Sequence, residues 1–199
     1  KSEYKTDNKF TCGATSVNGK LAMGSRNGVI RLYSKPCKNR ATTNFQANVG
    51  DQPIKSIDIS PDEEWVVAVS PYYLSLINTK NQINNKLAFD APMGKEKPPC
   101  IRLNLSQEHQ QIVANYHNGV LPEFSTSKFE LLGARIVSIV GSIGTAIVSW
   151  DFKRIKSGKR PTYTISFVGG EAIVDDKPIE VTRDVLFMSD NQLAMINLK

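Results

Sequence analysis

Short apolar or alternating runs, separated by turn residues, extend along most of the chain and predict β-structure. In the first clear unit we expect strands at residues 10–15, 20–25 and 29–34. The Asn-Gly pairs between these runs, at positions 18–19 and 27–28, accept positive φ and therefore favour tight hairpin turns. This part of the chain predicts a three-stranded antiparallel meander.

The same unit recurs three more times along the chain. The later strands are expected at residues 54–60, 65–70 and 73–78, then 124–129, 135–140 and 145–152, then 172–174, 184–188 and 192–198. In the third copy we expect a hairpin turn at residues 141–144. Where the second strand of each copy ends there is a serine, namely Ser25, Ser70, Ser142 and Ser189. These serines are about 45, 72 and 47 residues apart, and two of the three steps match a propeller blade.

Candidate fourth, outer strands follow at residues 42–46, 100–105 and 162–168. Four-stranded units repeated radially make a β-propeller, so we predict an all-β propeller of about four blades. The expected blades are residues 10–46, 54–105, 121–168 and 172–198, after a polar linker at residues 1–9. The fourth copy lacks an outer strand, so we expect this region to be the C-terminal part of a larger propeller of about seven blades. Its open edges would pair with those other blades or with a second copy.

Two stretches interrupt the repeats. Residues 80–99 are polar and predict a long connecting loop, in which Pro98 and Pro99 disfavour a helix. Ser106, followed by Ile112, Val113 and Tyr116, allows a short N-capped helix as an alternative to a loop.

Several motifs resemble one known family. Trp150-Asp151 ends a third strand, where WD40 repeats carry their namesake dipeptide, and SPDEEW at residues 60–65 is similar to their S-P-D-G-x-W hairpin, with Glu63 replacing glycine. FTCGAT at 10–15, G-x-L-A-x-G-S-x-x-G-x-I-R-L at 19–32 and WDFKRIKSGK at 150–159 resemble the WD40-like C-terminal propeller of the vacuolar import and degradation (Vid) proteins. The resemblance implies a eukaryotic, cytoplasmic, non-enzymatic protein linked to delivery of cargo for degradation.

Composition narrows the compartment and the class of partner. The chain has 199 residues, 40% of them apolar, with a net charge of +6 and no run long enough to span a membrane. Cys12, Cys37 and Cys100 are too far apart for a disulfide framework or a metal clip, which favours a reducing cytosolic or nuclear compartment. The excess of positive charge mildly favours anionic partners.

Catalytic, metal and cofactor sites are not expected. His109 and His117 are the only histidines, lack nearby cysteines and are expected to be solvated loop residues. The acidic runs at residues 62–64 and 175–176 lack calcium-loop spacing and are expected to be solvated turns. The sequence around Ser142 is not the elbow of a serine hydrolase.

The sharpest candidate for partner binding is a run of cations after the Trp-Asp strand: Lys153, Arg154, Lys156, Lys159 and Arg160. We expect them on one exposed loop, either as a solvated hairpin that deters edge pairing or as a docking patch for an acidic protein segment, phosphoinositide or nucleic acid. Aromatic residues are nearly absent there, which favours a protein or lipid anion over single-stranded RNA. We expect the partners to be other proteins, with anionic lipid or nucleic acid less favoured.

Aromatic residues mark the expected core and one further contact. Trp65, Trp150, Phe129 and Phe187 are expected to pack between blades, and Asp151 to have a structural role. Tyr72 and Tyr73 lie at a hairpin tip, where they either pack or contact a partner protein.

The sequence therefore predicts a non-enzymatic interaction scaffold whose partners are other proteins. The alternatives are an anion-binding module that uses residues 153–160 and a hydrolase that depends on His109 or His117.

Overall fold

The structure is a computed structural model that describes residues 9–35, 40–47, 52–80, 85–93 and 97–167, together with the backbone of three later strands. Most of the expected linker at residues 1–9 lies outside this part. Four antiparallel sheets are present in it, three of four strands and one of three. In every sheet the strands are ordered as they are in the sequence.

The first sheet contains β1 (Phe10–Thr15), β2 (Leu21–Ser25), β3 (Val29–Tyr33) and β4 (Thr43–Gln46). The second contains β5 (Ser56–Ile59), β6 (Trp65–Ser70), β7 (Tyr73–Asn78) and β8 (Cys100–Leu103). The third contains β9 (Phe124–Leu132), β10 (Arg135–Ile143), β11 (Ala146–Asp151) and β12 (Tyr163–Phe167). The fourth contains β13 (Ile173–Pro178), β14 (Asp184–Ser189) and β15 (Leu193–Asn197).

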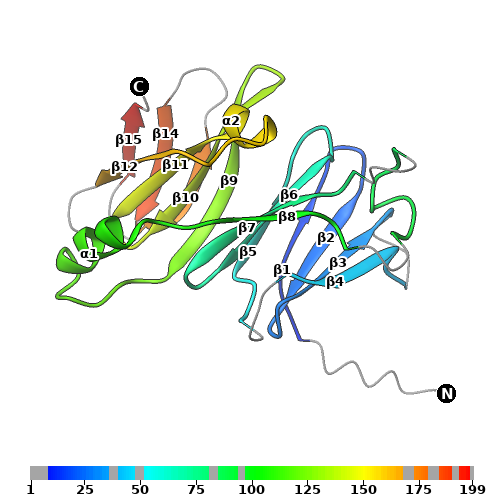
Figure 1. Cartoon of the computed structure of the whole chain (residues 1–199), viewed down its shortest axis with the longest axis horizontal. Helices are drawn as coiled ribbons and strands as arrows, with labels where there is room; N and C mark the ends of the chain where they lie inside the picture. Colours follow the sequence, from blue (N-terminus) through cyan, green and yellow to red (C-terminus); the bar gives the residue numbers. More distant parts are fainter. Residues whose placement is uncertain are drawn as a thin grey trace.

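The sheets follow one another side by side in chain order (Figure 1). Their first strands touch in succession, β1 against β5, β5 against β9 and β9 against β13. A series of sheets in contact through their first strands is the arrangement of propeller blades around an axis. The all-β, repeated-sheet architecture expected from the spacing is confirmed.

Among the side chains that the structure describes, the core lies in two layers between the sheets. The first boundary, between the first and second sheets, is mostly aliphatic and includes Ile30, Ile54 and Ile57. The second boundary, between the second and third sheets, is rich in aromatic rings and includes Trp65, Phe129 and Trp150. The expected burial of these three aromatic side chains is confirmed, since each is at most 6% exposed. The side chain of Phe187 lies outside the described residues.

The third sheet corrects two expected boundaries. The first strand runs on to Leu132 rather than ending at Phe129, and the second continues to Ile143, so residues 141–143 belong to a strand and the turn falls at Gly144 and Thr145. Ser142 and Ile143 pair with β11 and are buried, which keeps them in the ladder. Gly144, at φ 57°, supplies the left-handed turn conformation.

The turn at residues 60–64 corrects another expectation. Glu63 has φ 60°, the conformation that the usual glycine of this hairpin adopts readily, and its side chain is 5% exposed rather than solvated. Ser16, in the corresponding turn of the first sheet, donates a hydrogen bond to the Glu63 carboxylate. This contact joins the first two sheets and offsets the cost of left-handed backbone at a residue other than glycine.

Antiparallel order divides the connections between two faces of the molecule. Because the chain reverses at each strand, turns after first strands and connections after third strands lie at one end of the sheets. We call this end the α2 face, after the helix α2 (Phe152–Lys156) between β11 and β12. The opposite end is the α1 face, after α1 (Gln107–Asn115) between β8 and β9. The helix allowed after Ser106 is confirmed, with Ser106 as its N-cap.

Candidate partner-binding surface

The cations at residues 153–160, called here the basic segment, begin within a short helix and not a loop as expected. Asp151 caps α2, because its Oδ1 accepts a hydrogen bond from the backbone nitrogen of Arg154 at 3.0 Å. Such a cap contributes about 1 kcal/mol. The aspartate of the Trp-Asp dipeptide therefore orients the start of the basic segment, while Trp150 is fully buried in the core.

Two apolar side chains anchor α2 to the second boundary. Phe152 and Ile155 are 3% and 2% exposed, and their spacing of three residues puts both on the same face of the helix. The Phe152 ring packs edge-on against Trp65, with centroids 5.5 Å apart, and against Phe129 at 6.1 Å. This burial holds the backbone of α2 in place, so its polar side chains project from a fixed base.

All five predicted cations are exposed on the α2 face. Lys156 faces the Glu64 carboxylate of the neighbouring sheet, with Nζ and Oε2 3.9 Å apart. Among the described residues, no acidic side chain forms an ion pair with the other four: Lys153, Arg154, Lys159 and Arg160. Their charge is therefore available to an anionic partner.

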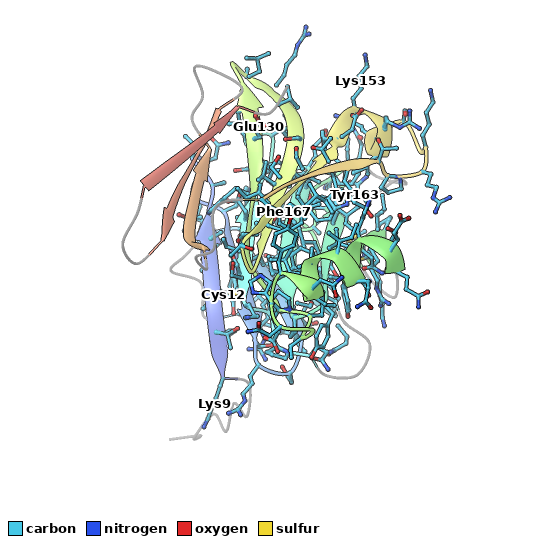
Figure 2. The ribbon with its side chains drawn as sticks, turned by 90° about the vertical axis from the view of Figure 1, so that its left-hand side faces the viewer. Lys9, Cys12, Glu130, Lys153, Tyr163 and Phe167 are labelled. Carbon is cyan, nitrogen blue, oxygen red and sulfur yellow. The ribbon has the colours of Figure 1, made fainter. Side chains whose placement is uncertain are left out.

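A groove of about 1180 Å³ adjoins the basic segment. One wall is α2, with Lys153 and Lys156, and the other is the end of the β9–β10 hairpin, with Leu132 and Arg135. In Figure 2 the Lys153 side chain extends away from the ribbon, at the same end of the molecule as Glu130 of β9. The basic segment is thus the edge of a concave surface.

Leu132 and Arg135 were missed from the sequence. They lie in a hairpin that projects past β11, because β9 and β10 have nine residues each whereas β11 has six. The pairing of β10 with β11 begins at Ser138, so Arg135 extends beyond it. Gly133, at φ 61°, forms the turn, and a glycine after two leucines was the available signal for the later hairpin end.

The two predicted tyrosines lie on the opposite face from the basic segment. Tyr72, in the β6–β7 turn, is 53% exposed on the α1 face. Tyr73 begins β7 and is partly buried, with the Arg102 guanidinium 4.2 Å from the centre of its ring. The structure therefore does not bring the two groups of predicted contact residues together.

The histidines are hydrogen-bonded to the third sheet and are not solvated loop residues as expected. His109, on α1, has its Nδ1 2.9 Å from the Tyr163 hydroxyl, and the Nε2 of His117 accepts from the Thr145 backbone nitrogen at 3.1 Å. They hold opposite ends of the α1 region against the third sheet. In the part of the chain that the structure describes, no cluster of three or more His, Cys, Asp or Glu side chains could hold a metal ion.

A carboxylate joins the first strands of the second and third sheets. Asp58 of β5 accepts a hydrogen bond from the Phe129 backbone nitrogen at 3.1 Å and lies 3.3 Å from Lys128 Nζ. Burial raises the pKa of the Asp58 carboxyl above its ordinary value of 3.8, although Lys128 acts in the opposite direction. Burial likewise raises the pKa of the partly buried Cys12 thiol above 9.0.

The model of the VID27 C-terminal WD40-like domain family matches residues 1–199. The chain belongs to this family. A curated relative, vacuolar import and degradation protein 27 of Schizosaccharomyces pombe, is 28% identical over 200 residues, which cover 98% of this chain. Because the match covers 24% of that protein, this WD40-like domain spans about a quarter of its relative's length. The family resemblance read from the motifs is confirmed.

Solved structures agree on the fold. The Cps50 (Swd1) β-propeller domain of Myceliophteria thermophila superposes with a TM-score of 0.63 at 7% identity, over 96% of this chain and 55% of that one. Raptor of Chaetomium thermophilum gives a TM-score of 0.64 at 11% identity, over 94% of this chain and 15% of that one. At such low identity the comparisons show a propeller fold and nothing further. In the described part of this domain, no helix is both long and apolar enough to cross a membrane.

Proposed function

We propose that this WD40-like domain is a non-catalytic platform for protein–protein interaction and that the α2 face is one of its contact surfaces. The main support is a cluster of exposed cations whose backbone is anchored by two buried side chains, Phe152 and Ile155. A surface fixed in this way loses little conformational freedom when a partner binds. The expected division into blades at residues 10–46, 54–105, 121–168 and 172–198 forms part of this proposal.

The cellular role is proposed from the family. The relative's name refers to vacuolar import and degradation, so we propose that this domain contacts proteins involved in the trafficking or degradation of cargo in the cytoplasm. The basic segment supplies charge for steering a partner, and the exposed Tyr72 supplies a second contact on the other face.

The test is quantitative capture of partner proteins by the full chain. Wild type is compared with a variant in which all five cations of the basic segment are changed to glutamate. We expect a defined subset of partners to be lost from the variant. Tyr72→Ala tests the second proposed contact on the opposite face, where we expect a different subset of partners to be lost, and thermal unfolding verifies that each variant remains folded. Identical capture by wild type and both variants would contradict a role for either surface.

A further inference from the structure

The lining of the groove beside α2 indicates the chemistry of a partner more specifically than the charge of the basic segment does. It lies between α2 and the projecting end of the β9–β10 hairpin, and Pro61 and Asp62 of the second sheet contribute to its lining. A partner in the groove would therefore contact two sheets and a helix at once. Such a concave site suits a narrow, extended segment of a protein better than a flat surface.

Each carboxylate that lines the groove accepts a hydrogen bond from another group of this domain. Hydrogen bonds reach Glu130 from the Ser138 hydroxyl, Asp151 from the Arg154 backbone nitrogen, and Asp62 from the Ser60 hydroxyl and the Glu64 backbone nitrogen. Glu130 is also only 3% exposed, so it presents little charge to the solvent. These hydrogen bonds hold the carboxylates in place but leave them charged, so the exposed Asp62 and Asp151 offset part of the positive charge of the lining, and an acidic partner depends on direct contact with the cations.

The cations on opposite walls are free to bind. Arg135, on the hairpin, and Lys153, on α2, are both exposed, and neither forms an ion pair within the described residues. A chain that lies between these walls would have a positive group on each side. Carboxylates spaced along an extended peptide complement that arrangement.

One exposed apolar side chain in the groove indicates that the partner also supplies an apolar contact. Leu132 is 46% exposed at the hairpin end and lines the same groove as Arg135. The groove has no exposed aromatic ring among its described lining, since Phe152 is buried and Tyr163 partly so. Bases of single-stranded RNA therefore lack a stacking platform, and a flat lipid surface cannot follow a concave wall.

We propose that this groove binds an extended acidic segment of a partner protein that also carries leucine-like side chains. The carboxylates lie between Arg135 and Lys153, and an apolar side chain covers Leu132. This proposal rests on the proposed interaction function and deepens it by stating the chemistry of the partner.

The experiment measures fluorescence anisotropy of a short labelled peptide of glutamates with two interspersed leucines, titrated with the full chain. The test variant combines Arg135→Glu and Lys153→Glu. The matched control combines Lys159→Glu and Arg160→Glu, which changes the net charge equally at two exposed positions of the basic segment that do not line the groove. Leu132→Ser tests the apolar contact. Urea unfolding is used to check that the three variants keep wild-type stability.

We expect the groove variant to bind about tenfold more weakly or worse, the control to lose about threefold or less, and Leu132→Ser to lose about threefold. Raising the salt concentration should weaken wild-type binding. Equal losses in the groove variant and its control would overturn the proposal, because general charge would then suffice. Absence of peptide binding would overturn it too, as would tighter binding of anionic vesicles or poly-uridine RNA. Failure here with intact partner capture would leave the interaction function standing.

Discussion

Two connections on the α2 face use the same packing device but form ion pairs of opposite sense with the preceding sheet. In the β7–β8 connection, Phe89 is fully buried in the first boundary, and in the β11–β12 connection, Phe152 is 3% exposed in the second. Each connection thus sends one aromatic ring into the boundary with the preceding sheet. Burial of such a ring removes a large apolar area from water and anchors the connection.

The residue that each connection contributes to an ion pair with the preceding sheet differs in charge. Asp90, next to Phe89, pairs with Lys20 of the preceding sheet, whereas Lys156, near Phe152, faces Glu64 of the preceding sheet. The second connection also carries four cations for which the described residues provide no ion pair. The comparison teaches that the buried ring serves the fold in both connections, while the charge around it varies from one connection to the other.

The largest expected effect comes from removing either ring. Phe89→Ala and Phe152→Ala should each lower the free energy of unfolding by about 3–5 kcal/mol, because each leaves a cavity in a buried cluster. Only Phe152→Ala should also weaken binding of the acidic peptide, since it releases α2. Urea unfolding followed by tryptophan fluorescence measures the first effect and anisotropy the second. A Phe152→Ala variant as stable as wild type would show that α2 is not anchored as described.

The second effect is a pH dependence of stability that we expect at the second boundary and not at the first. At the first boundary the inner strands join through a neutral hydrogen bond from Thr11 to the Ile54 carbonyl, whereas the second has the Asp58 carboxylate. Because the pKa of Asp58 is raised on folding, its contribution is fully present below about pH 3.8 and is lost as the pH rises through the folded-state pKa. Wild type should therefore gain stability relative to Asp58→Asn as the pH falls through that window.

The matched variant for this test is Asp58→Ala. At pH 7 it should lose about 1–3 kcal/mol, because the Phe129 backbone nitrogen loses its acceptor, while Asp58→Asn keeps an acceptor and stays within about 1 kcal/mol of wild type. Chemical unfolding at several pH values measures these differences. A difference between wild type and Asp58→Asn that does not change with pH would contradict the raised pKa.

The smallest effect concerns the two ion pairs. Lys20→Ala should cost more than Lys156→Ala, although each costs about 1 kcal/mol or less, because the Lys20 side chain is 15% exposed and that of Lys156 54%. Double-mutant cycles with Asp90→Ala and Glu64→Ala isolate the pair energies. High salt should reduce both, and an equal coupling energy for the two pairs would remove this distinction between the boundaries.

Sequence periodicity was a good guide to the repeats and a poor guide to the connections. Alternating runs and Asn-Gly pairs act locally, so the order of strands could be predicted from the chain alone. The helix α2 has five residues, too few for a periodic signal, and depends on an Asp151 cap and on burial of Phe152. Phe89 was hidden in a polar stretch, and the histidine contacts with Thr145 and Tyr163 join residues far apart in the chain.

The sequence by itself determined a chain of repeated antiparallel sheets, because hairpin pairing and strand alternation are encoded over a few neighbouring residues. The WD40-like family came from the resemblance of its motifs, such as Trp150-Asp151. The sequence also identified the basic segment as a candidate contact. Only the tertiary structure decided that Tyr72 lies on the other face and that Leu132 and Arg135 form a groove with α2. These relations depend on how separate sheets and connections pack against each other, and no local pattern specifies that packing.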